Sequence, residues 1–209
     1  MKKIILSTVA FLAFGFANAQ ETVIVVEDSN TELGMQEGNM WAEGAFSYSS
    51  TSNENASLKS SFSFTPQIGY MLTDEWGVGG YLSLAGGENN NDDKFGSWGI
   101  GAFARYYFLS LGKNENFQAY AEAGLGYSAL TDNPNIGDST TDNAFNAKLN
   151  VGLNYFFTSN WAATFTLANI VSYNNASPEN GDNTNSLNVN INLFQNIFAQ
   201  PQFGLLYKW

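Results

Sequence analysis

The sequence predicts an all-β protein whose strands form an eight-stranded antiparallel, transmembrane up-and-down β-barrel. Three observations favour this fold class. Segments of roughly ten to fourteen residues alternate apolar and polar side chains, which is the pattern of membrane-crossing strands. The connections between these segments alternate between short and long. Charged residues make up only 13% of the chain, about half the share that is usual in a soluble domain.

The N-terminus has the layout of a cleaved signal peptide, predicted over residues 1–19. Lys2 and Lys3 form a basic head, Ile4–Phe16 is apolar, and Ala17–Ala19 provides small residues for cleavage. The alternative is a membrane anchor, but Ile4–Phe16 is shorter than the roughly 20 residues that a spanning helix needs. We therefore expect export, and localisation in the bacterial outer membrane.

Two further segments follow the signal peptide in the predicted domain organisation. Residues 20–38 are an acidic lead-in, and residues 39–209 form the barrel. No apolar run long enough for a transmembrane helix and no sustained helical period occurs after the signal peptide, so helices are not expected to build the fold.

The composition excludes several functional classes. The chain has neither Cys nor His, which rules out disulfides, zinc–thiolate sites and His-dependent catalytic arrangements. We therefore expect no enzyme activity, no catalytic residues, no metal centre and no cofactor. Its 19 acidic residues outnumber 8 basic ones, for a net charge of −11. A nucleic-acid partner is excluded as well, because phosphate binding needs a basic surface.

Seven strands are predicted from alternation with a period of two. The clearest is Phe62–Tyr70, in which every second residue is apolar. The seven ranges are Met40–Ser49, Phe62–Tyr70, Trp76–Leu84, Ser97–Phe108, Phe117–Ala129, Phe145–Phe157 and Trp161–Tyr173.

The eighth strand is ambiguous. Leu187–Leu193 alternates with Asn residues, and Phe203–Trp209 resumes in the same parity. Either one long strand runs from Ser186 to Trp209 with a kink near Pro201, or two short strands form. We favour the single strand, with Leu187–Leu193 extending beyond the membrane.

The connections have the asymmetry of outer-membrane barrels, which combine short periplasmic turns with longer external loops. Leu72–Glu75 and Thr158–Asn160 are tight, and Leu109–Asn116 is moderate. The four longer loops are rich in Asn, Asp, Ser and Gly, and they cover Thr51–Ser57, Gly86–Phe95, Leu130–Asn143 and Asn174–Asn185.

Alternation alone does not say which face of the sheet points outward. A secreted, lipocalin-like binding barrel would turn its apolar face inward and its charges outward. The polar face is too poor in charge for that arrangement, and aromatic residues gather near the strand ends, where membrane barrels carry interfacial girdles. We therefore expect the apolar face to contact outer-membrane lipid, with the lipocalin-like barrel as an alternative.

Three sequence runs carry a family resemblance: Phe64–Tyr70, Phe103–Tyr107 and Phe203–Trp209. They resemble the small outer-membrane β-barrel domain proteins of Bacteroidota, which are related to OmpX and to the transmembrane domain of OmpA. The resemblance implies insertion by the barrel-assembly machinery, which recognises an aromatic-ended final strand; the residues expected to carry that signal here are Phe203, Leu205, Tyr207 and Trp209. Trp209 replaces the more usual terminal Phe. A peptidoglycan-binding domain is not expected.

Four charged residues fall on the predicted inward face: Glu43, Arg105, Glu122 and Lys148. Buried charges are tolerated only when they are paired, so a lumen network Arg105–Glu122–Lys148 that reaches Glu43 is expected. Its predicted role is to fill and rigidify the lumen, because eight strands enclose just enough room for side chains. A narrow ion path is an alternative, and an acid–base carboxylate pair is a weaker one.

The expected function is a structural or surface-interaction role for a plugged, monomeric barrel that displays polar loops. The alternative is a narrow channel or small-solute transporter. The acidic loops could also bind Ca²⁺ or Mg²⁺, although solvated surface is the preferred interpretation. The sequence identifies no extracellular ligand.

Overall fold

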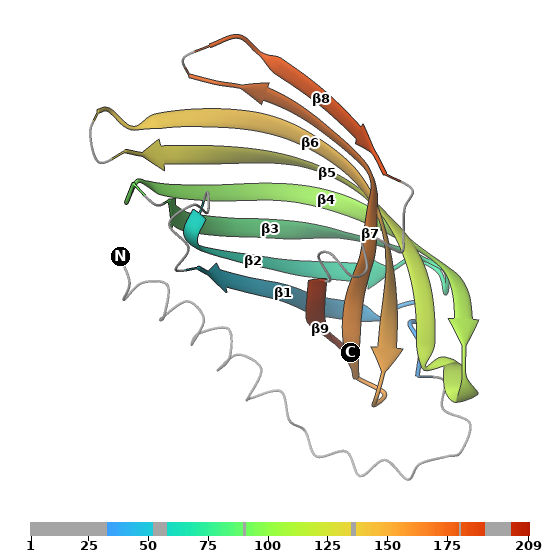
Figure 1. Cartoon of the computed structure of the whole chain (residues 1–209). Coiled ribbons are helices and arrows are strands. Elements are labelled where there is room, and N and C mark those ends of the chain that lie inside the picture. The colour runs from blue at the N-terminus through green and yellow to red at the C-terminus, as the bar shows by residue number, and fades with distance from the viewer. Residues whose placement is uncertain (1–32, 52–57, 90, 135–136, 180, 191–201) are drawn as a thin grey trace. The chain divides into compact units, whose positions relative to one another are not determined.

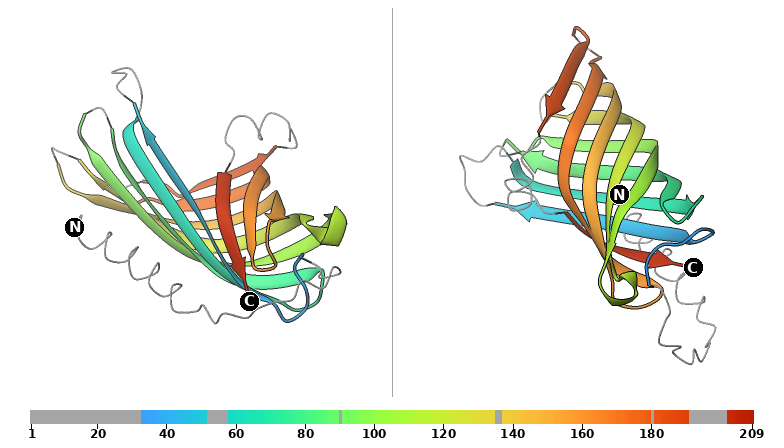
Figure 2. Two further views of the ribbon diagram at one scale, coloured as in Figure 1. Left: turned by 90° about the horizontal axis from the view of Figure 1, so that it is seen from below. Right: turned by 90° about the vertical axis from the view of Figure 1, so that its right-hand side faces the viewer.

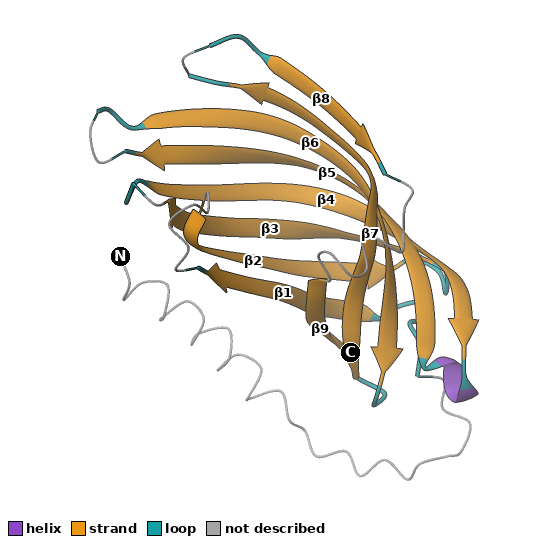
Figure 3. Cartoon of the chain, viewed as in Figure 1, coloured by secondary structure: helices purple, strands orange, loops and turns teal. Residues whose placement is uncertain are grey.

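The structure is a computed structural model, and it describes residues 33–51, 58–89, 91–134, 137–179, 181–190 and 202–209. The predicted signal peptide and most of the lead-in lie outside these residues. Nearly all of the described chain is β-strand (Figure 3). None of the helical segments in these ranges is both long and apolar enough to cross a membrane.

The strands form one closed antiparallel meander (Figure 1 and Figure 2). Each strand pairs with the next from β1 to β7, and β9 pairs with both β7 and β1. The ring therefore has eight positions, which confirms the predicted fold class. The strands are β1 Met40–Ser50, β2 Leu58–Met71, β3 Trp76–Asn89, β4 Lys94–Leu111, β5 Phe117–Asn133, β6 Thr140–Phe156, β7 Trp161–Ser177, β8 Thr184–Val189 and β9 Gln202–Lys208.

The favoured single final strand is wrong, because two strands share the eighth position. β8 pairs with the half of β7 nearer the long loops, over Val171–Ala176. β9 pairs with the half nearer the short turns, over Trp161–Thr166. Residues 191–201, which include part of the predicted extension and the predicted kink, lie outside the described residues. Among the described residues, β8 has β7 as its only partner strand, whereas β9 is paired on both sides.

Most strands are longer than the alternating segments that predicted them. β4 covers Lys94–Leu111, for example, where alternation indicated Ser97–Phe108. The reason is that apolar alternation marks only the part of a strand that faces lipid, while the backbone ladder continues into polar residues. A short 3-10 helix at Lys113–Glu115 forms the moderate turn between β4 and β5.

The apolar face points outward, as expected for a barrel in lipid. Trp98 and Leu125, on neighbouring strands, are 51% and 57% exposed. At the end with short turns, aromatic side chains pair across adjacent strands, with ring centroids 4.7 Å apart for Trp76 and Tyr106 and 4.6 Å apart for Phe117 and Tyr155. This belt matches the interfacial girdle of membrane barrels. The outward apolar face also argues against the lipocalin-like alternative.

An apolar core fills the lumen near the short turns. Inward side chains from seven strands and from residue 35 pack there: Met35, Trp41, Met71, Phe103, Tyr107, Tyr120, Phe156, Ala162 and Leu206. Inward glycines make room for the rings. A Cβ at Gly69 would lie 2.2 Å from the Trp41 ring, so no larger residue fits there without displacing it. The lumen is thus filled by apolar and aromatic groups as well as by the expected polar and charged ones.

Candidate functional site

Three of the four predicted lumen residues form a compact ion cluster on top of this core. Arg105 and Glu122 are direct neighbours across the β4–β5 ladder, and Glu43 reaches them from β1. Arg105 donates two hydrogen bonds to Glu43, of 2.9 and 2.5 Å, and two to Oε2 of Glu122, of 3.0 and 2.6 Å. Binding one carboxylate on each side suits the planar guanidinium group, whose N–H donors point in fixed directions.

The cluster is almost fully withdrawn from solvent. The Arg105 side chain is 1% exposed, against 5% and 3% for those of Glu43 and Glu122. Its guanidinium also lies 4.1 Å from the centroid of the Tyr120 ring, which adds a cation–π contact to the ion pairs. Because every strong donor of Arg105 is engaged, the cluster is a rigid partition across the lumen.

Lys148, the fourth predicted residue, is only loosely attached to this cluster. Its ammonium lies 3.9 Å from Oε1 of Glu122, which is beyond hydrogen-bond length, and 4.6 Å from the centroid of the Tyr81 ring. The Lys148 side chain remains 26% exposed. It therefore faces the open part of the lumen on the side of the long loops.

The end of the lumen with short turns is closed by residues 33–39, whose contacts the sequence did not predict. Met35 is buried in the core, and its N–H donates to Oε1 of Gln118 at 2.7 Å. Lys208 of β9 donates to the carbonyl oxygen of Gly34. Leu33 and Met35, two apolar residues spaced for one face of an extended chain, are the signal that could have indicated this insertion.

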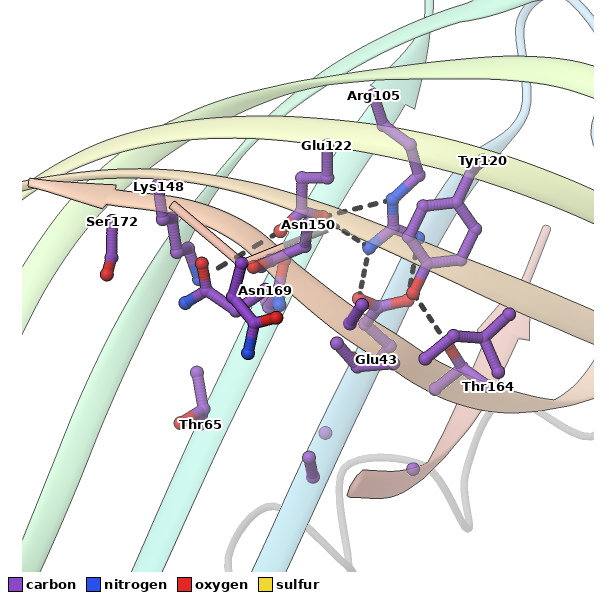
Figure 4. A pocket seen from close by; sticks show the side chains of 18 of the residues that line it. Glu43, Thr65, Arg105, Tyr120, Glu122, Lys148, Asn150, Thr164, Asn169 and Ser172 are labelled. Carbon is purple, nitrogen blue, oxygen red and sulfur yellow. Dashed lines mark hydrogen bonds and ion pairs between the residues drawn. The ribbon is translucent and has the colours of Figure 1, made fainter. Parts of the chain in front are cut away.

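Above the ion cluster, toward the long loops, lies a cavity of about 670 Å³ (Figure 4). The cluster and Tyr120 form its floor. Amide and hydroxyl side chains from β2, β6, β7 and β8 make most of its wall, with Lys148 among them. The uncharged polar lining residues are Thr65, Gln67, Asn150, Thr164, Thr166, Asn169, Ser172, Asn188 and Asn190.

Two β-bulges shape the wall of this cavity. In β7 the register with β6 shifts twice, once between Asn169 and Val171 and once between Thr166 and Ala168. The bulges set Asn169 opposite the inward Asn150 and bring Leu167 into the cavity lining. The alternation predicted for Trp161–Tyr173 puts Leu167 on the apolar, lipid-facing side together with Phe165, whereas in the structure Leu167 contributes to the cavity lining. Bulges re-aim side chains in this way.

The described residues contain no group of three or more carboxylates, His or Cys that could hold a metal ion. Asp92, in the loop between β3 and β4, and Glu88, near the end of β3, contact the Lys59 ammonium at 2.6 and 2.7 Å. That lysine raises the local positive charge, so these two carboxylates are poorly placed to attract a cation.

Comparisons with known proteins bear directly on this geometry. A family model described as outer membrane protein β-barrel domain matches residues 7–193. This chain belongs to that family. Among curated proteins, none matches the sequence.

Solved structures agree with the family at the level of the fold. Neisserial surface protein A is 16% identical with a TM-score of 0.52, and the match covers 82% of this chain and 96% of that one. Outer membrane protein OprG from Pseudomonas aeruginosa is 17% identical with a TM-score of 0.51, covering 85% of this chain and 98% of that one. Identities this low show a shared fold alone.

Family membership locates the barrel in the bacterial outer membrane, with lipid around its apolar face. The four residues of the expected assembly signal lie on β9 or directly after it. Phe203, Leu205 and Trp209 are exposed on the outside of the barrel, and Tyr207 stacks against Trp209 with centroids 5.8 Å apart.

Proposed function

We propose that this outer-membrane barrel is a non-conducting structural and surface-interaction protein that displays its four long loops outside the cell. One observation carries the proposal: Glu43, Arg105 and Glu122 form a buried, fully engaged partition across the lumen. A path for ions would have to break it and then pass the apolar core and Met35 beneath it. Breaking the cluster would leave buried charges unpaired, and passing the core would bring an ion into an apolar environment. Both steps are costly.

Conductance of the refolded protein in a planar lipid bilayer tests the closed lumen. The wild type should give no discrete current steps. A variant combining Glu43→Ala, Arg105→Ala, Glu122→Ala and Met35→Ala, which shortens the side chains of the partition and of the closing segment, should show measurable current. Uniform steps from the wild type, altered by Glu43→Gln, would instead support the channel or small-solute transporter.

Display of the loops can be tested with epitope insertions. An epitope inserted after Asp138, in the connection between β5 and β6, should be labelled by antibody on intact cells. The matched control carries the same epitope after Thr73, in the tight turn between β2 and β3, and should be labelled only after the outer membrane is permeabilised. Labelling in the reverse pattern would invert the proposed orientation.

The finer features of the proposal rest on the sequence. Residues 1–19 are proposed to be removed on export, which the mass of the mature protein would reveal. The barrel-assembly machinery is the proposed partner for Phe203, Leu205, Tyr207 and Trp209, and Trp209→Ala should lower the folded amount in the outer membrane. A monomer is proposed as well, and the motif set favours an origin in Bacteroidota. No reaction is assigned, because Arg105 occupies both lumen carboxylates.

A further inference from the structure

We infer that the cavity above the ion cluster is a binding site for a small, neutral, polyhydroxylated molecule of the size of a mono- or disaccharide. This inference goes beyond the proposed function, since a closed lumen would serve a structural role without any ligand. The cavity volume of about 670 Å³ lies in the range of roughly 300–1,000 Å³ that is typical of ligand pockets.

The polar groups in the wall are numerous and mostly unused. Within the described chain, the side chains of six lining residues make no hydrogen bond to another residue: Thr65, Asn150, Thr166, Asn169, Ser172 and Asn188. Oε1 of Gln67, also in the lining, is buried without a partner. Asn169 and Asn188 are exposed and the other four are partly exposed, so their amide and hydroxyl groups can be reached by a molecule that enters the cavity. The wall therefore offers hydrogen-bonding groups that no other described residue occupies.

These groups also converge on one place. Lys148, Ser172 and Asn188 lie opposite one another in register across β6, β7 and β8. Asn150 and Asn169 form a second row one step nearer the cluster. Figure 4 shows Lys148, Asn150 and Asn169 directed into the same space, and Ser172 and Asn188 line the same cavity. Asn169 has this direction because of the bulges in β7.

The charge balance and the chemistry of the wall select the ligand class. The charged groups that line the cavity sum to zero, since Arg105 and Lys148 balance Glu43 and Glu122. An anion would meet the two carboxylates and a cation the two bases, so a neutral molecule fits best. Amides and hydroxyls both donate and accept hydrogen bonds, as sugar hydroxyls do, and Leu167 and Ala168 offer an apolar strip for the C–H groups of a sugar ring.

Binding is tested on the full mature chain, refolded in a zwitterionic detergent that contains no sugar. Saturation-transfer NMR and calorimetry would follow glucose, N-acetylglucosamine, maltose and lactose, with inorganic phosphate as the anionic probe. At least one sugar should bind saturably, and the double variant Asn150→Ala/Asn169→Ala should weaken it about tenfold or more, since several hydrogen bonds are lost at once. Asn174→Ala, on the same strand but outside the cavity lining, is the matched control and should leave affinity unchanged.

A gel-mobility shift between unheated and boiled samples shows that each variant is folded. The inference is overturned if none of the four sugars binds saturably, or if the double variant and the control bind as the wild type does. It is also overturned if phosphate binds better than the sugars and Lys148→Met abolishes that binding, because the site would then be anionic in its selectivity. These results are independent of whether the barrel conducts.

Discussion

Replacing Arg105 with Met tests the idea that the lumen partition is held together by a buried charge cluster. The substitution keeps a long side chain but removes every donor to Glu43 and Glu122, both of which are buried. Two carboxylates would then share an apolar surrounding without a counter-charge. Removing one partner of a buried ion pair typically costs about 3–5 kcal/mol, or about two to four orders of magnitude in the unfolding equilibrium.

The same reasoning makes a second, opposite prediction. Changing Glu43, Arg105 and Glu122 together to Met removes all three charges and the cost of burying them. Such replacements are often neutral or stabilising, so the triple variant should recover most of the stability that Arg105→Met loses. Lys59→Met, which breaks only ion pairs at the surface, is the control and should cost much less than Arg105→Met.

Urea unfolding in detergent micelles, followed by tryptophan fluorescence, measures these differences at one pH. Trp41 lies 5.6 Å from the Arg105 guanidinium and reports on the cluster directly. The reasoning is refuted if Arg105→Met unfolds at the same urea concentration as the wild type. It is equally refuted if the triple variant is as unstable as the single one.

Three further predictions use the same preparation. Met35→Ala should lower the free energy of unfolding by about 2–5 kcal/mol, because Met35 is buried in the core, whereas Met40→Ala at an exposed position should cost clearly less; equal effects would mean that residues 33–39 do not close the barrel. Gly152→Ala should cost about 1–3 kcal/mol by overpacking, since a new Cβ would lie 2.2 Å from the Tyr120 ring, while Gly44→Ala, with 3.4 Å to its nearest neighbour, should be nearly neutral. The hydrogen bond from Lys59 holds the pKa of the Asp92 carboxyl below its ordinary value of 3.8. The contact between Asp92 and Lys59 therefore persists at neutral pH and is lost only as the pH falls below that value. In Lys59→Met, NMR titration should show the pKa of Asp92 returning toward 3.8, and an unchanged titration would contradict the contact.

Much of the fold follows from the sequence, because the period of two is imposed directly by strand geometry. The inward positions of Glu43, Arg105 and Glu122 follow from parity along their strands, and their mutual pairing follows from the cost of burying lone charges. Parity fails at Leu167 and Asn169, since a bulge inserts a residue without leaving any mark in the alternation. The cavity wall depends on those bulges, so alternation could not have described it.

The closure by Met35 escaped prediction for a different reason. Composition marks the lead-in as acidic, and a short apolar pair in such a stretch has no period long enough to indicate an element. Its burial depends on a partner far along the chain, Gln118, and single-sequence patterns carry no information on such distant contacts. The division of the eighth strand into β8 and β9 escaped prediction for the same reason. It depends on pairing with β7 and β1, and β1 lies far away along the chain.

The seam between the two ends of the barrel sets a constraint on the order of assembly. Trp41–Ala45 pairs with Gly204–Lys208, and Met40 and Trp209 exchange two backbone hydrogen bonds of 3.0 Å beside it. These partners are far apart along the chain, so the seam cannot form until residues 204–209 have been synthesised. Forming the seam also closes a longer loop of chain than the pairing of β1 with β2 does, and the ladder that it gains is shorter. Loop closure of this kind is slow, so we expect the seam to be the last strand pairing to form.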